Sequence, residues 1–468
     1  MRVAPDRVLF KTPAAWPDIH TSSKVTKGRA YLVFMNDSSQ TLLTAFDKEL
    51  HRKKRAVIAP VVSERNMRVF ETQMSNEIDK FLLRLWTASR DKEAVNMSVV
   101  CERLAVDVVG RLGFGYSLDT QADPSHRAVI EGIKHRTRRG TMWYKWNGLR
   151  LLDRVFDWMD RKSVRERADY LDILRTMIGR RMAVPPEQAA EMHDFWASIT
   201  KTKEAQGEAA EAGMVGKDVW FEALFFIFAG GSTTATLMSG VFFYLSRNPE
   251  PYRILAEEIR STFASGREIS QGPKLAGCKY LRAVLDETLR LSPSAMTPAW
   301  REQDRASVAA GEVFVVDGHV IPPGTQVGVS HYALQHDPAY FSDPDSFRPE
   351  RWISEMKGDL TADKRAFYPF SLGERNCAGR SMAYLEASLA VAKTVWYFDF
   401  EKAPGEEGRS GEGDLSGKER SPLDRGNNGE FQLCEGIAAQ LHDGPNLVFR
   451  PREGVEFGEL EKTTSGES

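Results

Sequence analysis

The 468-residue chain contains only four cysteines, and they lie far apart in the sequence: Cys101, Cys278, Cys377 and Cys434. This scarcity excludes a small secreted scaffold held by disulfides, and the spacing excludes a zinc finger. A net charge of −2 gives no support for a nucleic-acid-binding protein, because neither sign of charge predominates. A reducing compartment is the simplest environment for such a chain.

The N-terminus lacks the apolar core of a signal peptide. One internal run, residues 223–246, carries no charge and is long enough to cross a bilayer. Its centre, however, holds the small and hydroxylic residues Gly230, Gly231, Ser232 and Thr233. A helix that is apolar all round can equally form the core of a large protein. Taken alone, this run leaves a membrane span and a buried helix as equal alternatives.

Cys377 lies in a short stretch, residues 369–380, that is unusual for its glycines and its charge. Gly373 and Gly379 flank the cysteine, Arg375 precedes it by two positions, and apolar residues at helical spacing follow. We therefore expect Cys377 in a tight turn at a helix N-terminus, where free N–H groups, the helix dipole and Arg375 lower the pKa of the thiol. The thiolate is the form that binds metal. The alternative is a small buried cysteine ahead of a helix.

This stretch resembles the haem-binding loop of the cytochrome P450 family, whose pattern is Phe-x-x-Gly-x-Arg-x-Cys-x-Gly. Phe370, Gly373, Arg375, Cys377 and Gly379 fill every fixed position. The resemblance implies that these residues bind haem b and that Cys377 is the axial ligand of its iron. It also implies a fold that is mainly α with a minor β region, the cytochrome P450 fold, in which the uncharged run is a buried helix.

A second motif lies in that run. Residues 229–234 are similar to the family pattern (Ala/Gly)-Gly-x-(Asp/Glu)-Thr-(Thr/Ser). The resemblance makes Thr233 the threonine that hydrogen-bonds dioxygen, and Ser232 replaces the usual acid, so both are candidate catalytic residues. Serine can pass a proton only through bound water. Because glycine in a helix costs about 1 kcal/mol relative to alanine, two adjacent glycines need a reason. In the family they open a groove for dioxygen, and a close helix crossing is the alternative.

Three basic residues resemble the family's contacts to the haem propionates. His51 and Arg55 are spaced i, i+4 in the basic run 51–55 and so share one face of a helix. Arg301 follows the turn 291–301, which the family places against the substrate. For the basic run, the alternative interpretation is a solvated face.

A structural triad is implied by two further motifs. Glu287 and Arg290 are similar to the family's Glu-x-x-Arg motif, and Arg351 lies in its partner, residues 347–352. We interpret Glu287, Arg290 and Arg351 as structural. Removing one of them would leave a buried charge unpaired, at a cost of about 3–5 kcal/mol.

We expect a single catalytic domain over residues 1–468, with a small β region drawn from residues 1–35 and 305–330. Residues 405–429 hold seven glycines among charged residues and are predicted to be a disordered insertion. The polar, Ala- and Glu-rich segment 201–217 is predicted to be a surface loop.

The function that the resemblance implies is a haem-thiolate monooxygenase. It inserts one oxygen atom from O₂ into a small apolar organic substrate, with electrons from NADPH delivered by NADPH-cytochrome P450 reductase. Likeness to filamentous-fungal enzymes implies a step in secondary-metabolite, mycotoxin-like biosynthesis. Ser232 keeps open a P450-like isomerase, dehydratase or oxidative coupling enzyme. A haem-binding protein without turnover is a further alternative. We expect a monomer that binds no nucleic acid.

The cellular location also follows from the resemblance. Fungal members of this family have an N-terminal membrane anchor and work at the cytoplasmic face of the endoplasmic reticulum. Here Arg2-Val3-Ala4-Pro5 resembles their second strand, so the sequence has no counterpart of the anchor. We therefore expect either that the gene model starts late or that the protein is a natural short form, which is cytosolic if Met1 is the true start.

Overall fold

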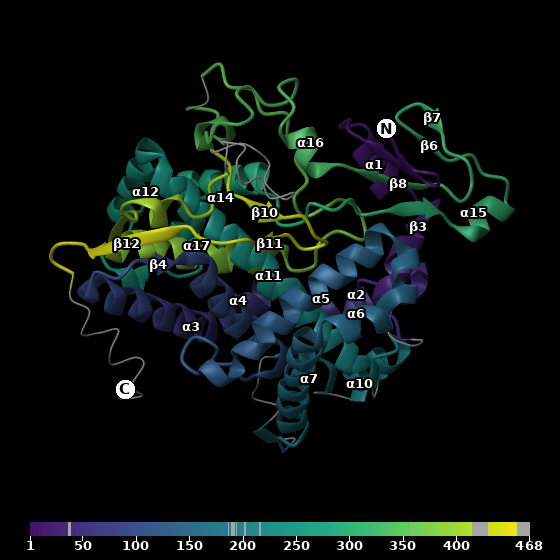
Figure 1. The fold of residues 1–468 in the computed structure, drawn as a ribbon, viewed down its shortest axis with the longest axis horizontal. Helices are drawn as coiled ribbons and strands as arrows, with labels where there is room; N and C mark the ends of the chain where they lie inside the picture. The colour runs from purple at the N-terminus through teal and green to yellow at the C-terminus, as the bar shows by residue number, and fades with distance from the viewer. Residues whose placement is uncertain are drawn as a thin grey trace.

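Helices occupy most of the computed structural model, and a small sheet lies at one end, near the N-terminus (Figure 1). The structure describes residues 1–35, 39–185, 187–188, 192, 194–200, 203–214, 217–356, 358–413 and 429–455. This arrangement confirms the prediction of a mainly α fold with a minor β region.

The α-helices range from single turns to the long α11. They are α1 (Ala15–His20), α2 (Lys48–Ile58), α3 (Glu64–Asp91), α4 (Met97–Phe114), α5 (Ala128–Lys145), α6 (Asp153–Met159), α7 (Arg161–Met182), α9 (Phe195–Thr200), α10 (Lys203–Glu211), α11 (Lys217–Arg247), α12 (Pro249–Thr262), α13 (Pro273–Gly277), α14 (Lys279–Leu291), α15 (Arg305–Ala309), α16 (His331–Gln335) and α17 (Arg380–Tyr397). Short 3₁₀ helices join them: η1 (Arg29–Phe34), η2 (Pro124–Arg127), η3 (Asn147–Leu152), η4 (Gly266–Glu268), η5 (Pro349–Trp352), η6 (Lys364–Ala366) and η7 (Glu406–Arg409).

The largest sheet of the described chain has the strand order β1-β2-β8-β5-β3 and joins the N-terminus to the segment around residues 301–329. Its strands are β1 (Arg2–Ala4), β2 (Arg7–Phe10), β3 (Val25–Lys27), β5 (Arg301–Gln303) and β8 (Gln326–Val329). Smaller sheets pair β6 (Val315–Val316) with β7 (His319–Val320), β10 (Leu433–Cys434) with β11 (Gln440–Leu441), and β12 (Asn446–Pro451) with β4 (Val95–Asn96) and β9 (Phe398–Lys402). Residues 1–35 thus contribute β1, β2 and β3, and residues 305–330 contribute β6, β7 and β8. Strand β5 lies just before the second range.

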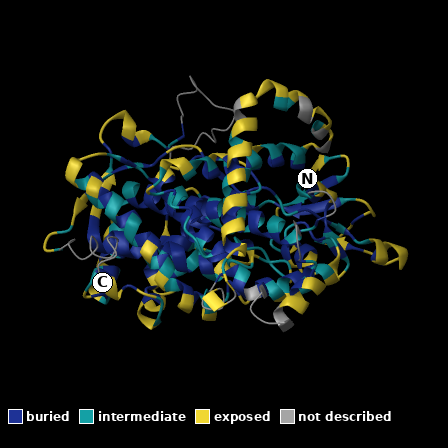
Figure 2. Cartoon of the chain, turned by 90° about the horizontal axis from the view of Figure 1, so that it is seen from below, coloured by how far each residue is buried: buried dark blue, intermediate teal, exposed yellow. Residues whose placement is uncertain are grey.

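Helix α11 runs through the centre of the helical part and packs against α4, α14 and α17. Buried residues fill the middle of the molecule, and exposed ones lie on the outer helices (Figure 2). Among the described residues, α11 is the one helix long and apolar enough to cross a membrane, but 61% of its most apolar window is buried. This burial decides for a core helix over a membrane span.

The adjacent glycines of α11 lie where it crosses α4. A Cβ at Gly230 would approach Cγ2 of Val109 to 2.7 Å, and one at Gly231 would lie 3.0 Å from Cγ2 of Val106. The first distance is too short for a side chain and the second is tight, so the close helix crossing is one reason for the two glycines. These distances do not test the groove that the family pattern implies, which stays a prediction.

Two loop predictions had different outcomes. The segment 201–217 was predicted to be a loop, and this is wrong for its described part, because α10 spans Lys203–Glu211. Ala, Glu, Lys and Gln are strong helix formers. Their propensity explains why this segment is helical although its sequence shows no apolar periodicity. The predicted insertion 405–429 is described at its ends, where Arg247 donates to the carbonyl of Gly408 at 2.7 Å. Residues 414–428 lie outside the described residues.

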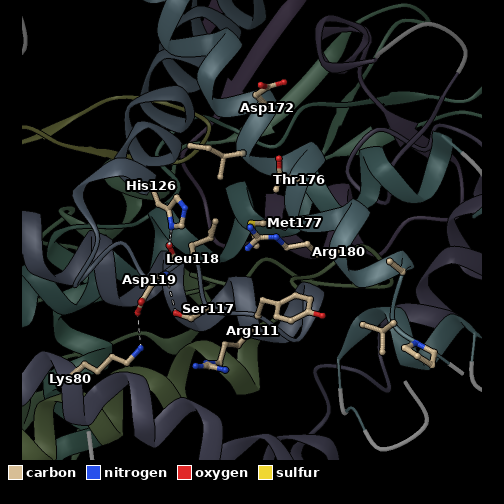
Figure 3. Close-up of a pocket in the computed structure, with 15 residues that line it drawn as sticks. Lys80, Arg111, Ser117, Leu118, Asp119, His126, Asp172, Thr176, Met177 and Arg180 are labelled. Atoms are coloured by element: carbon tan, nitrogen blue, oxygen red, sulfur yellow. Dashed lines mark hydrogen bonds and ion pairs between the residues drawn. The ribbon is translucent and has the colours of Figure 1, made fainter. Parts of the chain in front are cut away.

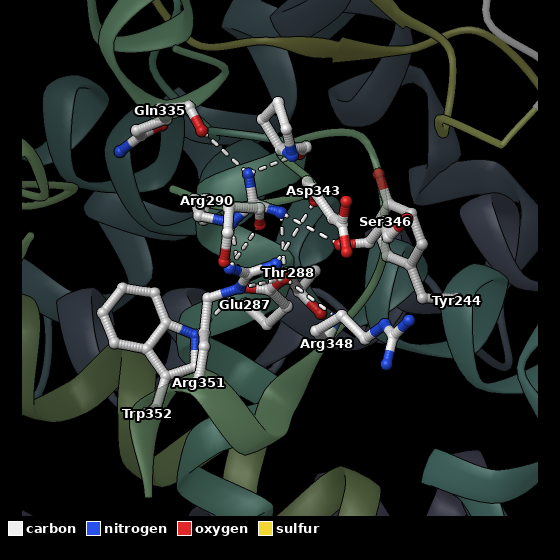
Figure 4. A network of polar contacts seen from close by, with 12 residues as sticks. Tyr244, Glu287, Thr288, Arg290, Gln335, Asp343, Ser346, Arg348, Arg351 and Trp352 are labelled. Carbon is white, nitrogen blue, oxygen red and sulfur yellow. Dashed lines mark hydrogen bonds and ion pairs between the residues drawn. The ribbon is translucent and has the colours of Figure 1, made fainter. Parts of the chain in front are cut away.

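A buried ion network joins α14 to η5 (Figure 4). Nη2 and Nε of Arg290 each lie 2.9 Å from a carboxylate oxygen of Glu287, and Nε of Arg351 lies 3.0 Å from Oε1 of Glu287. The Trp352 indole and the backbone N–H of Arg348 also donate to Glu287, each at 2.9 Å. The structure therefore brings the predicted triad together. The carboxylate of Glu287 accepts hydrogen bonds from all of these donors.

Candidate active site

A cavity lies between α2, the middle of α11 and the loop that precedes α17. Cys377 lines it from the loop, Thr233 from α11 and His51 from α2. Much of the remaining wall is apolar and includes Leu42, Leu43, Ile58, Val62, Val109, Leu112, Phe225, Phe226, Phe228, Met382 and Ile437. Of the four cysteines, Cys377 is the one in this lining. Residues from three separate sequence motifs therefore meet at one place.

The loop around Cys377 is held by its own backbone. The N–H of Cys377 donates to the carbonyl of Phe370 at 2.9 Å, and the Phe370 ring packs against Tyr384 of α17 with 5.0 Å between centroids. Gly373 has a φ of +74°, and a Cβ there would lie 2.1 Å from the carbonyl oxygen of His20. Only glycine fits such a turn. Phe370 and Gly373 therefore shape the loop and do not line the cavity themselves.

The prediction that the pKa of the Cys377 thiol is lowered is wrong. Burial raises this pKa, and the N–H of Gly379 and the charges of Arg55 and Arg380 oppose the increase without cancelling it. The helix terminus and the nearby cations could be read from the sequence, but the depth of the site could not. Protein surrounds Cys377, but the residue is exposed within the cavity that it lines, so its sulfur is accessible to a group bound there.

Four cations gather on one side of the cavity. Lys27 of β3, Arg55 of α2 and Arg375 line it, whereas Arg301 of β5 does not, although its charge acts on Lys27 and Arg375. Burial, then Arg301 and Arg375, lower the pKa of Lys27 well below its usual value, and burial and Arg301 lower the pKa of Arg375 to about 10. Within the described chain, none of these four cations forms an ion pair with a carboxylate. The cluster therefore has unbalanced positive charge.

The side chains of this cluster are held by neutral groups. Arg375 donates to the carbonyls of Ala45 and Phe46 at 2.6 and 3.1 Å, and Arg55 donates to the backbone carbonyl and side chain of Asn376 at 2.6 and 2.7 Å. Burial, followed by the charges of Arg375 and Lys27, lowers the pKa of His51 to about 3, so this histidine is neutral at pH 7.

These features fit haem b. Buried cations without a counter-charge are costly, and two propionates would supply the missing negative charge. Glu222, whose charge acts on Lys27, is already bound to Lys54 at 2.8 Å and to the N–H of Leu42 at 2.9 Å. On the cysteine side, a Cβ at Gly379 would meet only Sγ of Cys377, at 4.0 Å, so a flat group has free approach to the thiol.

The two candidate catalytic residues of α11 have different positions. Thr233 lines the cavity, and its hydroxyl donates to the carbonyl of Ala229 at 2.7 Å. Ser232 is half-buried and does not line the cavity, and its carbonyl accepts from Thr236 at 2.9 Å. Thr233 can therefore contact a molecule in the cavity, whereas Ser232 can act only through intermediaries.

Some cavity residues were not predicted from the sequence. Lys27 comes from a segment without a motif, but a signal was present, because strand alternation puts Val25 and Lys27 on the same face. A lysine on the buried face of a strand is unusual and needs a partner or a ligand. Ile437 and Ala438 also line the cavity, from a C-terminal segment that offered no signal.

A second hollow lies between α3, α4 and α7 and is shown in Figure 3. Lys80 forms an ion pair with Asp119 at 2.8 Å, and Nδ1 of His126 hydrogen-bonds the carbonyl of Leu118 at 2.8 Å. These polar groups already have partners, and no cysteine lines this hollow. The cavity at Cys377 is therefore the better candidate for an active site.

Comparison with known proteins agrees with this geometry. The family model for cytochrome P450 matches residues 11–416. The chain belongs to the cytochrome P450 family. It is 30% identical to a cytochrome P450 monooxygenase of Gibberella zeae, over 95% of this chain and 99% of that one. It is also 32% identical to cytochrome P450 monooxygenase poxM of Penicillium oxalicum, over 86% of this chain and 77% of that protein.

These matches confirm the predicted family, the P450 fold and the class of enzyme, a monooxygenase. Membership of the P450 family also implies a cysteine-ligated haem iron, O₂, electrons from a redox partner and an organic substrate.

Proposed function

We propose that this P450 is a haem-thiolate monooxygenase of fungal secondary metabolism, with Cys377 as the axial ligand of haem b. The observation that carries the assignment of the ligand is the presence of Cys377, alone among the cysteines, in a cavity flanked by unbalanced buried cations. When bound, the haem supplies activation of O₂ and transfer of one oxygen atom to the substrate.

We propose separate roles for the residues that would contact the propionates and those that would contact the substrate. Lys27, Arg55, Arg301 and Arg375 would balance the charge of the propionates, and neutral His51 would donate a hydrogen bond to one of them. Apolar side chains such as Phe225 and Phe228 exclude water and favour an apolar part of the substrate beside Thr233. We propose that the protein is a monomer and that its electrons come from NADPH through NADPH-cytochrome P450 reductase.

Thr233 is proposed to hydrogen-bond dioxygen and to help position the protons delivered to it. Ser232 is proposed to relay these protons less effectively than the usual acid. General acid catalysis is worth roughly 10²–10⁴-fold, so partial loss should give slow turnover with some hydrogen peroxide released. We expect Thr233→Ala to reduce the fraction of NADPH that yields product by about 10-fold or more. Ser232→Asp should increase this fraction. The measurement is product, peroxide and NADPH for a metabolite selected by spectral titration.

Thr233→Ser is the matched control for this pair, because it keeps the hydroxyl and should keep most of the product yield. Mass spectrometry under ¹⁸O₂ tests the reaction class, since a monooxygenase incorporates one labelled atom into the product. An isomerase or dehydratase incorporates none. If Ser232→Asp has no effect and Thr233→Ala leaves product formation unchanged, the isomerase or dehydratase alternative becomes the better assignment.

An exposed apolar surface around η3 and α6 supports a location at the endoplasmic reticulum membrane. Leu151 is 91% exposed and Trp158 is 71% exposed. Trp146, Leu152, Val155 and Met159 are exposed nearby. Exposed apolar side chains that include tryptophan are typical of segments that enter the headgroup region of a bilayer. We propose that this patch, the α6 patch, contacts the cytoplasmic leaflet.

The double variant Leu151→Glu, Trp158→Glu should weaken binding to phospholipid vesicles by about 10-fold or more. Burying one such side chain contributes about 1.5–3 kcal/mol, and a charged residue would lose this contribution. Co-sedimentation with vesicles of phosphatidylcholine and phosphatidylinositol measures the effect. Val69→Glu, on α3, changes a residue that is 47% exposed outside the patch and should not alter binding. Equal loss in both variants would contradict a role for the α6 patch.

A further inference from the structure

A second cavity, which we call the arginine cavity, lies between η1, α5, α7 and α11. Its volume is about 450 Å³, enough for part of an organic molecule. Four arginines line it, two from α5 and two from α7: Arg136, Arg139, Arg167 and Arg175. Among the described residues, no aspartate or glutamate is in the lining, although the charges of Asp160 and Glu166 act on His135 there. The cavity therefore presents strong positive charge on its inner surface.

The arginines differ in whether they are already paired. Arg139 binds Asp157, and Arg175 lies 3.6 Å from Asp172 on the outer surface. Arg136 and Arg167 have no ion pair within the part of the chain that the structure describes. Burial raises the pKa of Tyr170, and the charge of Arg136 opposes this increase, which places Arg136 close to the phenol. Arg136 is half-buried and free to bind an anion.

Three further polar atoms in the lining have no hydrogen-bond partner among the described residues. They are Oη of Tyr170, Nε2 of His135 and Nε1 of Trp143, and all three are shielded from the outer solvent. Tyr170 is only 2% exposed. An unpaired buried polar group costs about 1–3 kcal/mol, so a small shift of these side chains toward an anion in the cavity would be favourable. The tyrosine hydroxyl and the indole N–H both donate hydrogen bonds.

A small pocket of about 40 Å³, which we call the neck, lies between the arginine cavity and the cavity at Cys377. Phe34, Arg136, Phe221 and Leu224 line both the neck and the arginine cavity. Leu43, Phe225, Phe228 and Ile437 line both the neck and the cavity at Cys377. A molecule with one charged end and a slender apolar body could therefore reach from one cavity to the other once the phenylalanine side chains of the neck rotate aside.

We propose that the arginine cavity binds the carboxylate of the substrate, so that this P450 acts on organic acids and oxidises them at an apolar position away from the acid group. The proposal rests on the monooxygenase function and adds the chemical class of its substrate. Arg136, at the junction of neck and cavity, forms a two-pronged ion pair with the carboxylate. Tyr170 donates a hydrogen bond to it, and the neck directs the apolar body toward Thr233.

Decanoate and decanamide are suitable probes because they share one shape and differ in charge. Isothermal calorimetry on the haem-loaded protein, without reductase or NADPH, should show decanoate binding at least about 10-fold more tightly than decanamide. Arg136→Gln should weaken decanoate binding about 10-fold, which corresponds to about 1.4 kcal/mol, and leave decanamide unchanged. Tyr170→Phe keeps the ring and should weaken decanoate binding roughly 3- to 10-fold.

Arg165→Gln is the matched control, because it removes an exposed arginine of α7 that does not line the cavity. Equal affinity for the two probes, an equal loss in Arg136→Gln and Arg165→Gln, or phosphate binding as tightly as decanoate would overturn the proposal. Since no turnover is involved, this result is independent of the ¹⁸O₂ experiment. Loss of labelled product with charge-dependent binding intact would contradict the monooxygenase function alone.

Discussion

Replacing Cys377 by histidine is expected to give a protein that still binds haem but has lost the red-shifted ferrous–CO band of thiolate-ligated haem completely. The physical reason is the change of donor atom, because the band depends on a sulfur ligand and imidazole supplies nitrogen. Monooxygenase turnover should disappear with it, since thiolate donation of electron density favours O–O cleavage. The CO difference spectrum of the reduced protein is the measurement, with haem content determined separately.

The other cysteines provide the controls for this experiment. Cys278→Ala and Cys434→Ser change residues outside the cavity and should keep the band, as should Cys101→Ala if the protein folds. If the band were lost in one of these three variants and kept in Cys377→His, the axial ligand would have been assigned to the wrong cysteine. The haem content of each variant separates a lost ligand from a lost cofactor.

Removing Arg351 is expected to have the largest effect on stability. Arg351→Ala leaves the buried Glu287 with one of its two cations, which costs about 3–5 kcal/mol. Unfolding entropy of about 2.1 cal/mol/K per residue converts this into a decrease in Tm of roughly 3–5 °C for a chain of this length. Since total stability is only about 5–15 kcal/mol, the yield of haem-loaded protein should also fall. Differential scanning fluorimetry measures the shift.

Arg348→Ala is the control, because its exposed side chain points away from the network and only its backbone N–H contacts Glu287 (Figure 4). The pH dependence gives an independent check. Burial raises the pKa of Glu287, but Arg290 and Arg351 lower it more, and the net pKa lies below 4.5. The network therefore stabilises the fold above pH 4.5 and is lost as pH falls through the lowered pKa. The difference in Tm between the unaltered protein and Arg351→Ala should become smaller in that acid range. A difference that stays constant with pH would contradict an ionic origin of the stabilisation.

The sequence predicted what is carried by local motifs. The loop at residues 370–379, the threonine of α11 and the triad could be read because each needs particular residue types at fixed spacing. Lys27 and Ile437 could not be predicted in this way, because their role comes from tertiary contacts between segments hundreds of residues apart. The pKa of Cys377 was predicted in the wrong direction for the same reason, since burial depends on the whole fold.

The glycines of α11 and the charges of the arginine cavity also separate what local sequence predicts from what tertiary contacts decide. The sequence indicated that Gly230 and Gly231 needed a reason, but only the structure shows how closely they approach Val109 and Val106. Likewise, Arg136 and Tyr170 belong to helices that carried only packing information in the sequence. Their alignment around one cavity depends on the pairing of α5 with α7, which no local pattern specifies.

The close approach of Gly373 to the carbonyl of His20 sets a constraint on biosynthesis. These two residues are separated by more than 350 positions, so the ribosome makes one side of the contact long before the other. At about 5–20 residues per second, the N-terminal segment waits roughly 20–70 s for its partner loop. During that time α1 and its strands have no cysteine loop to support. Capture of the cofactor, which needs the loop at Cys377, is therefore an event late in synthesis.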